Sequence, residues 1–377
     1  MMACMRTLPL TLFVASLHLF AHAACAQTTT STTTSTTTTT RPTTWTASGW
    51  IEASYNASSA SRTNLPVGFF YQPDSTQLNQ AWLVLDKPLV KDGPNAGPGF
   101  HLDVFAGTDY VFTRAFGLLS RQTSEIGVDP LQFYISGHIK GFAKGTDLKL
   151  GRFSSPISAE YNSGPLNELP SHTYSFIFDP FTHTGLYSET ALSDRLTLLA
   201  GLVTGSDVFV PPGVRGTGIG GLRYTDKDPK KSAELIAIIG PGTFNREFGF
   251  NNVDVVDLLL TYPLNPRLLM TFEAIVGWEG NVPGMGDVNW GGAVGYLTWN
   301  LNAHLDGTVR VELFNDEQGN RTGFAGDYRA ATAGLKWQPD PHWILRPELR
   351  HDDHSGAAPF EGRNHLTTAT IDAIYRF

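Results

Sequence analysis

The stretch "HLTTATIDAIYRF" at residues 365–377 indicates the fold of the whole chain. Every second residue from Phe377 back to Ala369 is apolar, and the residues between them are mostly polar, such as Asp372. Ile374 breaks this alternation. A period of two places the apolar side chains on one face of a β-strand. A last strand that ends on an aromatic residue suits a barrel that closes by pairing its last strand with its first, so we expect a closed β-barrel.

The same period of two recurs along the chain. It is clear in "LQFYISGHIKG" at 131–141, "PRLLMTFEAIVGW" at 266–278 and "HLDGTVRVELF" at 304–314. These runs are about as long as the nine to eleven residues that a tilted membrane strand needs, whereas soluble strands average about five or six residues. A soluble β-sandwich would show the same alternation with its charged face outward, so the length of the runs, the predicted signal peptide and the C-terminal stretch are what favour the membrane.

The alternation predicts an all-β chain, a transmembrane antiparallel barrel of about sixteen strands. The expected strands cover residues 45–56, 78–88, 99–110, 130–142, 146–156, 182–192, 195–205, 217–226, 232–241, 252–263, 266–278, 288–301, 304–315, 327–338, 341–353 and 365–377.

The connectors between these strands alternate in length. Those that follow even-numbered strands are short and rich in turn-forming residues, as in "DKDPKK", "LNP" and "QPDP". Those that follow odd-numbered strands are longer, and residues 89–98 are the exception to this rule. Short periplasmic turns and long outer loops are typical of bacterial outer-membrane barrels, with both chain ends on the periplasmic side.

Two segments precede the predicted barrel at residues 45–377. Residues 1–26 have one charge, an apolar stretch and small residues before a cleavage site, which predicts a signal peptide for export to the bacterial outer membrane. Its cleavage would remove both cysteines; lipid attachment at Cys25 is an alternative. Residues 27–44 are rich in threonine and are expected to form a disordered tether, or else a glycosylated or wall-contacting segment.

The polar faces of the strands are expected to line the lumen. A Lys or Arg that points to lipid near the bilayer midplane costs about 2 to 4 kcal/mol, so Arg310 and Glu312 should point inward. A barrel of about sixteen strands is wide enough to hold water. The predicted pore-lining residues are His138, Lys140, Lys149, Arg267, Glu273, Asp306, Arg310, Glu312, Arg346 and Glu348.

One long connector could control the width of the pore. The chain between residues 157 and 181 has little periodicity but several aromatic residues, which favours an ordered segment. We expect it to fold into the lumen as a constriction loop in which Glu160, Glu168 and Asp179 set the local charge. A loop packed on the outer rim is the alternative.

Six stretches, in this order, carry a family resemblance: "GWIEASYN" at 49–56, "LNQAWLVLDKP" at 78–88, "AGTDY" at 106–110, "LQFYISG" at 131–137, "LGRFSSPISAEYN" at 150–162 and "SFIFDPFTHTGLY" at 175–187. With them the barrel segment resembles the OmpL-like β-barrel porin family. The family favours a glycine shortly before Glu160, where this chain has Ser158 and Ala159. The resemblance implies a passive outer-membrane channel of a Gram-negative-type bacterium that passes small hydrophilic solutes or ions.

The resemblance also implies partners. A terminal Phe377 with Tyr375 before it resembles the assembly signal that the barrel-insertion machinery recognises, and the barrel would contact outer-membrane lipids. A homo-oligomer is left open. The formal charge of −8, which becomes −9 without Arg6, mildly favours cations. Basic residues are scattered, so no nucleic-acid partner is expected.

The sequence predicts neither catalysis nor a bound cofactor or metal. His351 and Asp353 could bind a divalent ion, but at a strand end they more simply form a solvated rim. Two other functions are kept as alternatives. One is an adhesive or structural barrel with a plugged lumen, and the other is an outer-membrane hydrolase that uses His351 or His354.

Overall fold

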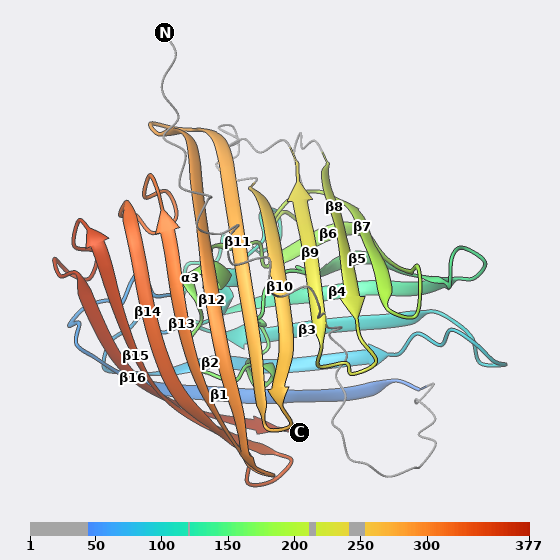
Figure 1. The fold of residues 1–377 in the computed structure, drawn as a ribbon, viewed down its shortest axis with the longest axis horizontal. Helices are drawn as coiled ribbons and strands as arrows, with labels where there is room; N and C mark the ends of the chain where they lie inside the picture. Colours follow the sequence, from blue (N-terminus) through green and yellow to red (C-terminus); the bar gives the residue numbers. More distant parts are fainter. Residues whose placement is uncertain (1–43, 120, 211–215, 241–252) are drawn as a thin grey trace.

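The computed structural model describes residues 44–119, 121–210, 216–240 and 253–377. These residues form a closed barrel of sixteen antiparallel strands, each paired with its neighbours in sequence, and β1 (Thr46–Ser58) pairs with β16 (His365–Arg376) (Figure 1). The predicted signal peptide and all of the predicted tether except Thr44 lie outside the described residues.

The other strands follow in chain order around the barrel. They are β2 (Ser75–Lys87), β3 (Gly99–Gly107), β4 (Gly127–Ile139), β5 (Thr146–Ser154), β6 (Thr182–Ala191), β7 (Leu196–Val203), β8 (Thr217–Thr225), β9 (Ser232–Ile239), β10 (Asp254–Asn265), β11 (Leu268–Val282), β12 (Gly286–Asn302), β13 (Leu305–Asp316), β14 (Gly326–Trp337) and β15 (Trp343–Gly356).

Each of the sixteen predicted strands is confirmed, with ends that differ by a few residues. The largest differences are in the β11–β12 hairpin, where pairing continues to Val282 and Gly286 beyond the predicted ends. Only three residues join these two strands, and Gly284 there has a φ of 79°, a left-handed conformation that favours glycine. This is the one outer connector that is short, because both strands are long.

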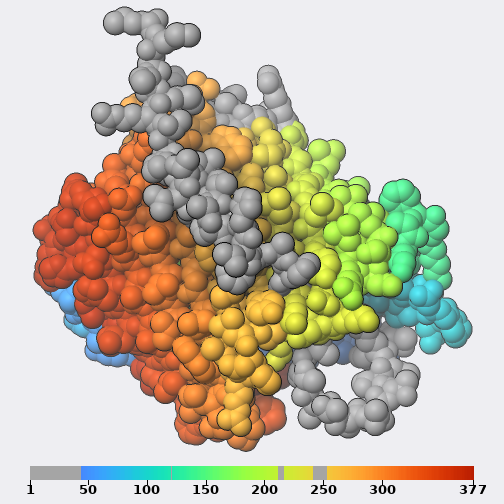
Figure 2. All heavy atoms as spheres, in the orientation of Figure 1, coloured from blue at the N-terminus to red at the C-terminus, as the bar shows by residue number. Residues whose placement is uncertain are grey.

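The barrel wall is polar inside and apolar outside. In β13, Arg310 and Glu312 are buried, whereas Val309, Val311 and Leu313 are 42 to 60% exposed. Exposed apolar side chains occur around the barrel, from Ile51 on β1 to Ile371 on β16, and Figure 2 shows the part of the outer surface formed by β9–β15, from yellow to red. This inside-out arrangement suits a wall that faces lipid. Among the described residues, no helix is long and apolar enough to cross a bilayer.

The seam between the first and last strands explains the opening stretch. Phe377 N donates to Gly49 O at 3.0 Å, and Gly49 N donates to Phe377 O at 3.1 Å, so the terminal residue closes the ladder. Ile374, which breaks the apolar alternation, points inward and is fully buried in an inner cluster with Trp50 and Trp82. Its side chain therefore belongs to a local apolar patch on the inner wall.

Candidate pore and its inner loop

The connector between β5 and β6, residues 155–181, folds into the barrel, and we call it the inner loop. It contains a 3₁₀ turn, η2 (Gly164–Leu166), and a short helix, α3 (Tyr174–Phe178), which contacts β12. The side chain of Thr173 caps α3 by accepting a hydrogen bond from Phe176 N. Most residues of the loop are buried, and Tyr174 is completely so. The loop packs against strand residues from β1, β2 and β10–β15.

Arg346 on β15 holds the first half of the inner loop. Its guanidinium donates to the carbonyl oxygens of Gly164 at 2.7 Å and Asn167 at 2.9 Å. On its other side it pairs with Asp372 and, at 3.1 Å, with Glu52. All four of these contacts are buried. Because a guanidinium has five fixed donors, one arginine can join the barrel seam to the loop backbone.

Three further inward charges hold the middle of the loop. Arg310 donates to the carbonyl oxygen of Ser171 at 2.5 Å, and Arg350 donates to that of His172 at 2.5 Å. Glu348 accepts a hydrogen bond from Ser171 N at 3.2 Å. Arginines thus satisfy the loop's carbonyl groups, and a carboxylate satisfies an N–H group.

The start of the loop and α3 are held by carboxylates on the neighbouring strands. Glu312 accepts hydrogen bonds from Tyr174 N at 3.0 Å and from Ser175 N at 2.9 Å. Glu273 accepts one from Ala159 N at 3.1 Å. A negative charge at the start of a helix is favourable, and here the charge comes from the barrel wall.

Glu160 is the loop's own charged contact with the wall. Its carboxylate is 2.7 Å from Arg310 and 2.9 Å from His172, and it accepts a hydrogen bond from Tyr296 at 2.8 Å. Burial alone would raise the pKa of Glu160, but the charge of Arg310 and the contacts with His172 outweigh it and bring the pKa to about 2. Burial also lowers the pKa of His172. Glu160 is therefore a carboxylate at neutral pH.

The other two predicted loop carboxylates behave differently. Glu168 pairs with Lys336 at 3.3 Å and is partly exposed. Asp179 is buried, and neither of its carboxylate oxygens has a hydrogen-bond partner among the described residues. The structure thus brings Glu160 and Glu168 to the barrel wall and leaves Asp179 unpaired.

The ten predicted pore-lining residues divide into three groups. Five are buried on inward strand faces and form hydrogen bonds with the backbone of the inner loop. These five are Glu273, Arg310, Glu312, Arg346 and Glu348. Three are half-buried on strands: His138, Lys149 and Asp306. The last two are corrected: Lys140 and Arg267 lie in exposed turns, because β4 ends at Ile139 and β11 begins at Leu268.

Charged side chains also lie on the part of the barrel wall opposite Arg310, Arg346 and Arg350. Lys149 on β5 lies 5.2 Å from the ring centre of Tyr134 and 6.0 Å from that of Tyr187. Arg223 on β8 pairs with Glu189 at 3.0 Å and also with Glu234. Lys149 and Glu189 keep part of their surface exposed, unlike the arginines under the loop.

Several side chains that hold the inner loop in place were not among the predicted pore-lining residues. Arg350 and Asp352 continue the period of two that starts at Arg346, so the same signal could have found them. Glu52 and Asp372 lie on the first and last strands, and only closure of the barrel brings them beside Arg346. His351 and Asp353, the candidate ion site, are exposed at the outer rim with 3.5 Å between their side chains. No metal-binding group is found among the described residues.

A closed barrel with a polar interior, an apolar outer face and a loop folded inside is the architecture of a pore-forming outer-membrane protein. The chain belongs to the family described as "Putative beta-barrel porin-2, OmpL-like", which it matches over residues 44–377. It is thus an outer-membrane porin, and the resemblance found in the sequence is confirmed. The family is one of channels, in line with the expectation that the chain is not an enzyme.

Solved structures show the same fold at low sequence identity. The outer-membrane channel DcaP of Acinetobacter baumannii has a TM-score of 0.60 at 10% identity, with 88% of this chain and 97% of that chain covered. An anion-selective porin from Comamonas acidovorans has a TM-score of 0.58 at 11% identity, with 89% and 99% covered. OmpT of Vibrio cholerae in its trimer form has a TM-score of 0.55 at 9% identity, with 89% and 99% covered. No curated protein sequence matches the chain.

Proposed function

We propose that this porin is a passive channel for small hydrophilic solutes, and that the inner loop narrows it. The observation that carries the proposal is the clamp of Arg310, Arg346 and Arg350 on the loop backbone between Gly164 and His172. A barrel of sixteen strands has a lumen wide enough for water. A buried loop fixed to one half of the wall leaves the other half for the solute path.

The solute path then runs along the wall that the loop does not clamp. The polar side chains that keep some exposure there are Lys149, Glu189 and Arg223 on β5, β6 and β8. With Glu234 and the partly exposed Asp147 on β5 counted as well, acidic groups on this wall outnumber basic ones. We therefore propose a weak preference for cations, in agreement with the net charge of the chain.

A deletion tests whether the loop narrows the pore. Removal of residues 162–174 takes away the carbonyl groups that the three arginines hold, and we expect larger single-channel conductance in a planar lipid bilayer. Removal of residues 93–97 from the exposed periplasmic turn between β2 and β3 is the matched control and should leave conductance unchanged. Equal conductance of the intact chain and the 162–174 deletion would rule out the constriction.

The same recordings separate the porin from a plugged barrel. The observation that favours a plug is the nearly complete burial of Arg310, Arg346 and Arg350 under the loop. Protein that inserts, as shown by heat-modifiable migration on a gel, but passes no current would support an adhesive or structural barrel. Discrete current steps would support the channel, and reversal potentials in a salt gradient would show its ion preference.

Export, assembly and oligomerisation complete the proposal. Residues 1–26 would be removed on export, and the barrel-insertion machinery would recognise Tyr375 and Phe377. Both aromatic side chains are exposed at the end of β16, and the ring centres of Tyr375 and Trp343 are 5.0 Å apart. This exposure supports a role outside the lumen. One fold relative is a trimer by description, so we also propose a homo-oligomer. Cross-linking in detergent would test this.

A further inference from the structure

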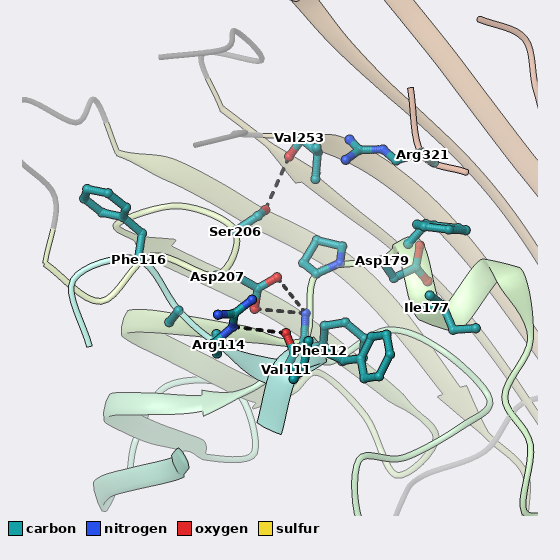
Figure 3. A pocket seen from close by; sticks show the side chains of 14 residues that line it. Val111, Phe112, Arg114, Phe116, Ile177, Asp179, Ser206, Asp207, Val253 and Arg321 are labelled. Carbon is teal, nitrogen blue, oxygen red and sulfur yellow. Dashed lines mark hydrogen bonds between the residues drawn. The ribbon is translucent and has the colours of Figure 1, made fainter. Parts of the chain in front are cut away.

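A cavity of about 480 Å³ lies on the outer side of the inner loop (Figure 3). Its walls come from connectors that follow odd-numbered strands, and among its lining residues are Phe112, Arg114, Asp179, Phe181, Asp207 and Arg321. Sites for small molecules have volumes of about 300 to 1,000 Å³, with mainly apolar walls and a few polar groups. The cavity therefore has the size of a solute site.

Asp179 is the acidic group of the cavity whose carboxylate has no hydrogen-bond partner among the described residues. It is 6% exposed, and neither carboxylate oxygen accepts a hydrogen bond from the described residues. Burial raises its pKa, as do the nearby carboxylates Glu273 and Asp257 and, more weakly, Glu312, while Arg321 lowers it. A buried carboxylate without donors is unfavourable, so a cationic ligand would gain from binding here.

Asp207 lines the same cavity, and its carboxylate, unlike that of Asp179, accepts hydrogen bonds from the backbone. Its oxygens accept hydrogen bonds from Phe181 N at 3.1 Å and from Thr182 N at 2.7 Å. Asp207 therefore holds the start of β6 in place. Asp179 has no comparable structural task.

Arg321 is the basic group of the cavity with unused donors. Its side chain is 10% exposed, and its Nε and Nη2 atoms make no hydrogen bond with the described residues. The guanidinium lies 3.7 Å from the ring centre of Trp290 and forms an ion pair with Glu279 at 3.6 Å, a distance too long for a hydrogen bond. Burial lowers the pKa of Arg321 to about 10, so it is a cation at neutral pH.

Phenylalanine side chains provide part of the remaining lining, which also includes Arg114, Ser206 and Asp207. Phe112, Phe178 and Phe181 come from the connectors on two sides of the cavity, and Phe112 is stacked on Phe69 at 4.5 Å. These rings offer an apolar surface beside the two charged groups. A simple cation would be attracted by Asp179 but repelled by Arg321. A simple anion would be attracted by Arg321 but repelled by Asp179.

We propose that the cavity binds a small zwitterion, an amino-acid-like molecule with an ammonium group, a carboxylate and an apolar side chain. Asp179 accepts hydrogen bonds from the ammonium group. Arg321 donates to the carboxylate in the forked geometry that suits this pair. The phenylalanine rings pack against the apolar side chain. The site goes beyond passive diffusion and does not depend on whether the lumen conducts.

Calorimetric titration of the full-length protein in detergent micelles at pH 7 tests the site. The probes are phenylalanine, which has both charges, and phenethylamine and 3-phenylpropionate, which each keep one. We expect saturable binding of phenylalanine and affinities at least about tenfold weaker for the other two. Because Arg321 lies on Trp290, tryptophan fluorescence should change on binding. Equal affinity for the three probes, or no saturable binding of phenylalanine, would overturn the proposal.

Variants assign the two charges separately. Asp179→Asn and Arg321→Gln should each weaken phenylalanine binding by about tenfold, and Asp179→Asn should weaken phenethylamine binding but leave 3-phenylpropionate unaffected or better bound. Arg321→Lys keeps the charge near Trp290 and tests the need for the forked donor if Arg321→Gln does not fold. Lys140→Ala, in an exposed turn, is the control. Unchanged affinity in folded Asp179→Asn protein would refute the assignment, whatever the conductance.

Discussion

Replacement of Arg346 by methionine is the sharpest test of the clamp. The change removes a guanidinium that is 1% exposed and contacts Glu52, Asp372 and three loop carbonyl groups. Breaking a buried ion pair by removing one partner costs about 3 to 5 kcal/mol, because the other charge is left buried and unpaired. We expect this loss in the free energy of unfolding if the loop stays in place and keeps water out.

The structure also defines the other possible response. If the loop leaves the wall, water can hydrate Glu52 and Asp372, and the loss of stability will be smaller while the single-channel conductance rises. The assay is therefore paired: urea unfolding in lipid vesicles, followed by tryptophan fluorescence, and conductance in a planar bilayer. Arg346→Met combined with Glu52→Gln and Asp372→Asn should recover much of the stability, because no buried charge is left unpaired.

The result that refutes the clamp is specific. An Arg346→Met protein that keeps both the stability and the conductance of the unaltered chain would show that the contacts of Arg346 do not position the loop. Lys140→Ala serves as the control, because Lys140 is exposed in a periplasmic turn and pairs with Asp92 on the surface. Surface pairs of this kind contribute about 0 to 1 kcal/mol.

Three further predictions concern charge. Glu160 has a pKa of about 2 against an ordinary 4.5, so the stability that it contributes is complete above pH 4.5 and is lost as the pH falls through 2. The single-channel conductance should therefore stay constant from pH 7 to about pH 4.5. Glu160→Gln should raise the conductance at pH 7, because it removes the ion pair with Arg310. Glu361 accepts hydrogen bonds from three backbone N–H groups at residues 61–63, so Glu361→Gln should expose that loop to limited proteolysis without changing the barrel's heat-modifiable migration. Lys149→Ala should increase the cation preference measured by reversal potential, and an unchanged potential would show that this wall does not face the solute path.

The strands could be predicted from the sequence because a period of two is a local signal. A residue's own neighbours decide which face of the strand it occupies, and the cost of charge in lipid decides which face points inward. Errors arose where the local signal ends. Lys140 and Arg267 continue the alternation by sequence, but turns begin at these positions, so their side chains are released to the solvent. Ile374 broke the pattern for a non-local reason, since Trp50 and Trp82 surround it only when the barrel closes.

The partner of each inward charge could not be predicted in the same way. Glu312 is correctly expected to point inward, but the groups that it binds, Tyr174 N and Ser175 N, lie more than a hundred residues earlier in the chain. No periodicity connects a strand face with an irregular loop. The sequence therefore predicts the charged wall and the inner loop as two separate features, and only the closed barrel shows that they hold each other.

The hydrogen bonds between the wall arginines and the inner loop should contribute little to the stability of the barrel itself. In a water-filled lumen Arg310, Arg346 and Arg350 would be hydrated, so the loop replaces water–arginine hydrogen bonds with carbonyl–arginine ones, and the net gain per bond is only about 1.5 to 3 kcal/mol even for charged groups. Strand pairing does not take part in this exchange, because the ladder hydrogen bonds lie within the wall. Loss of the loop's contacts should thus widen the pore and leave the barrel closed. The clamp is best understood as a device that sets the width of the channel, and the sixteen paired strands as the structure that survives without it.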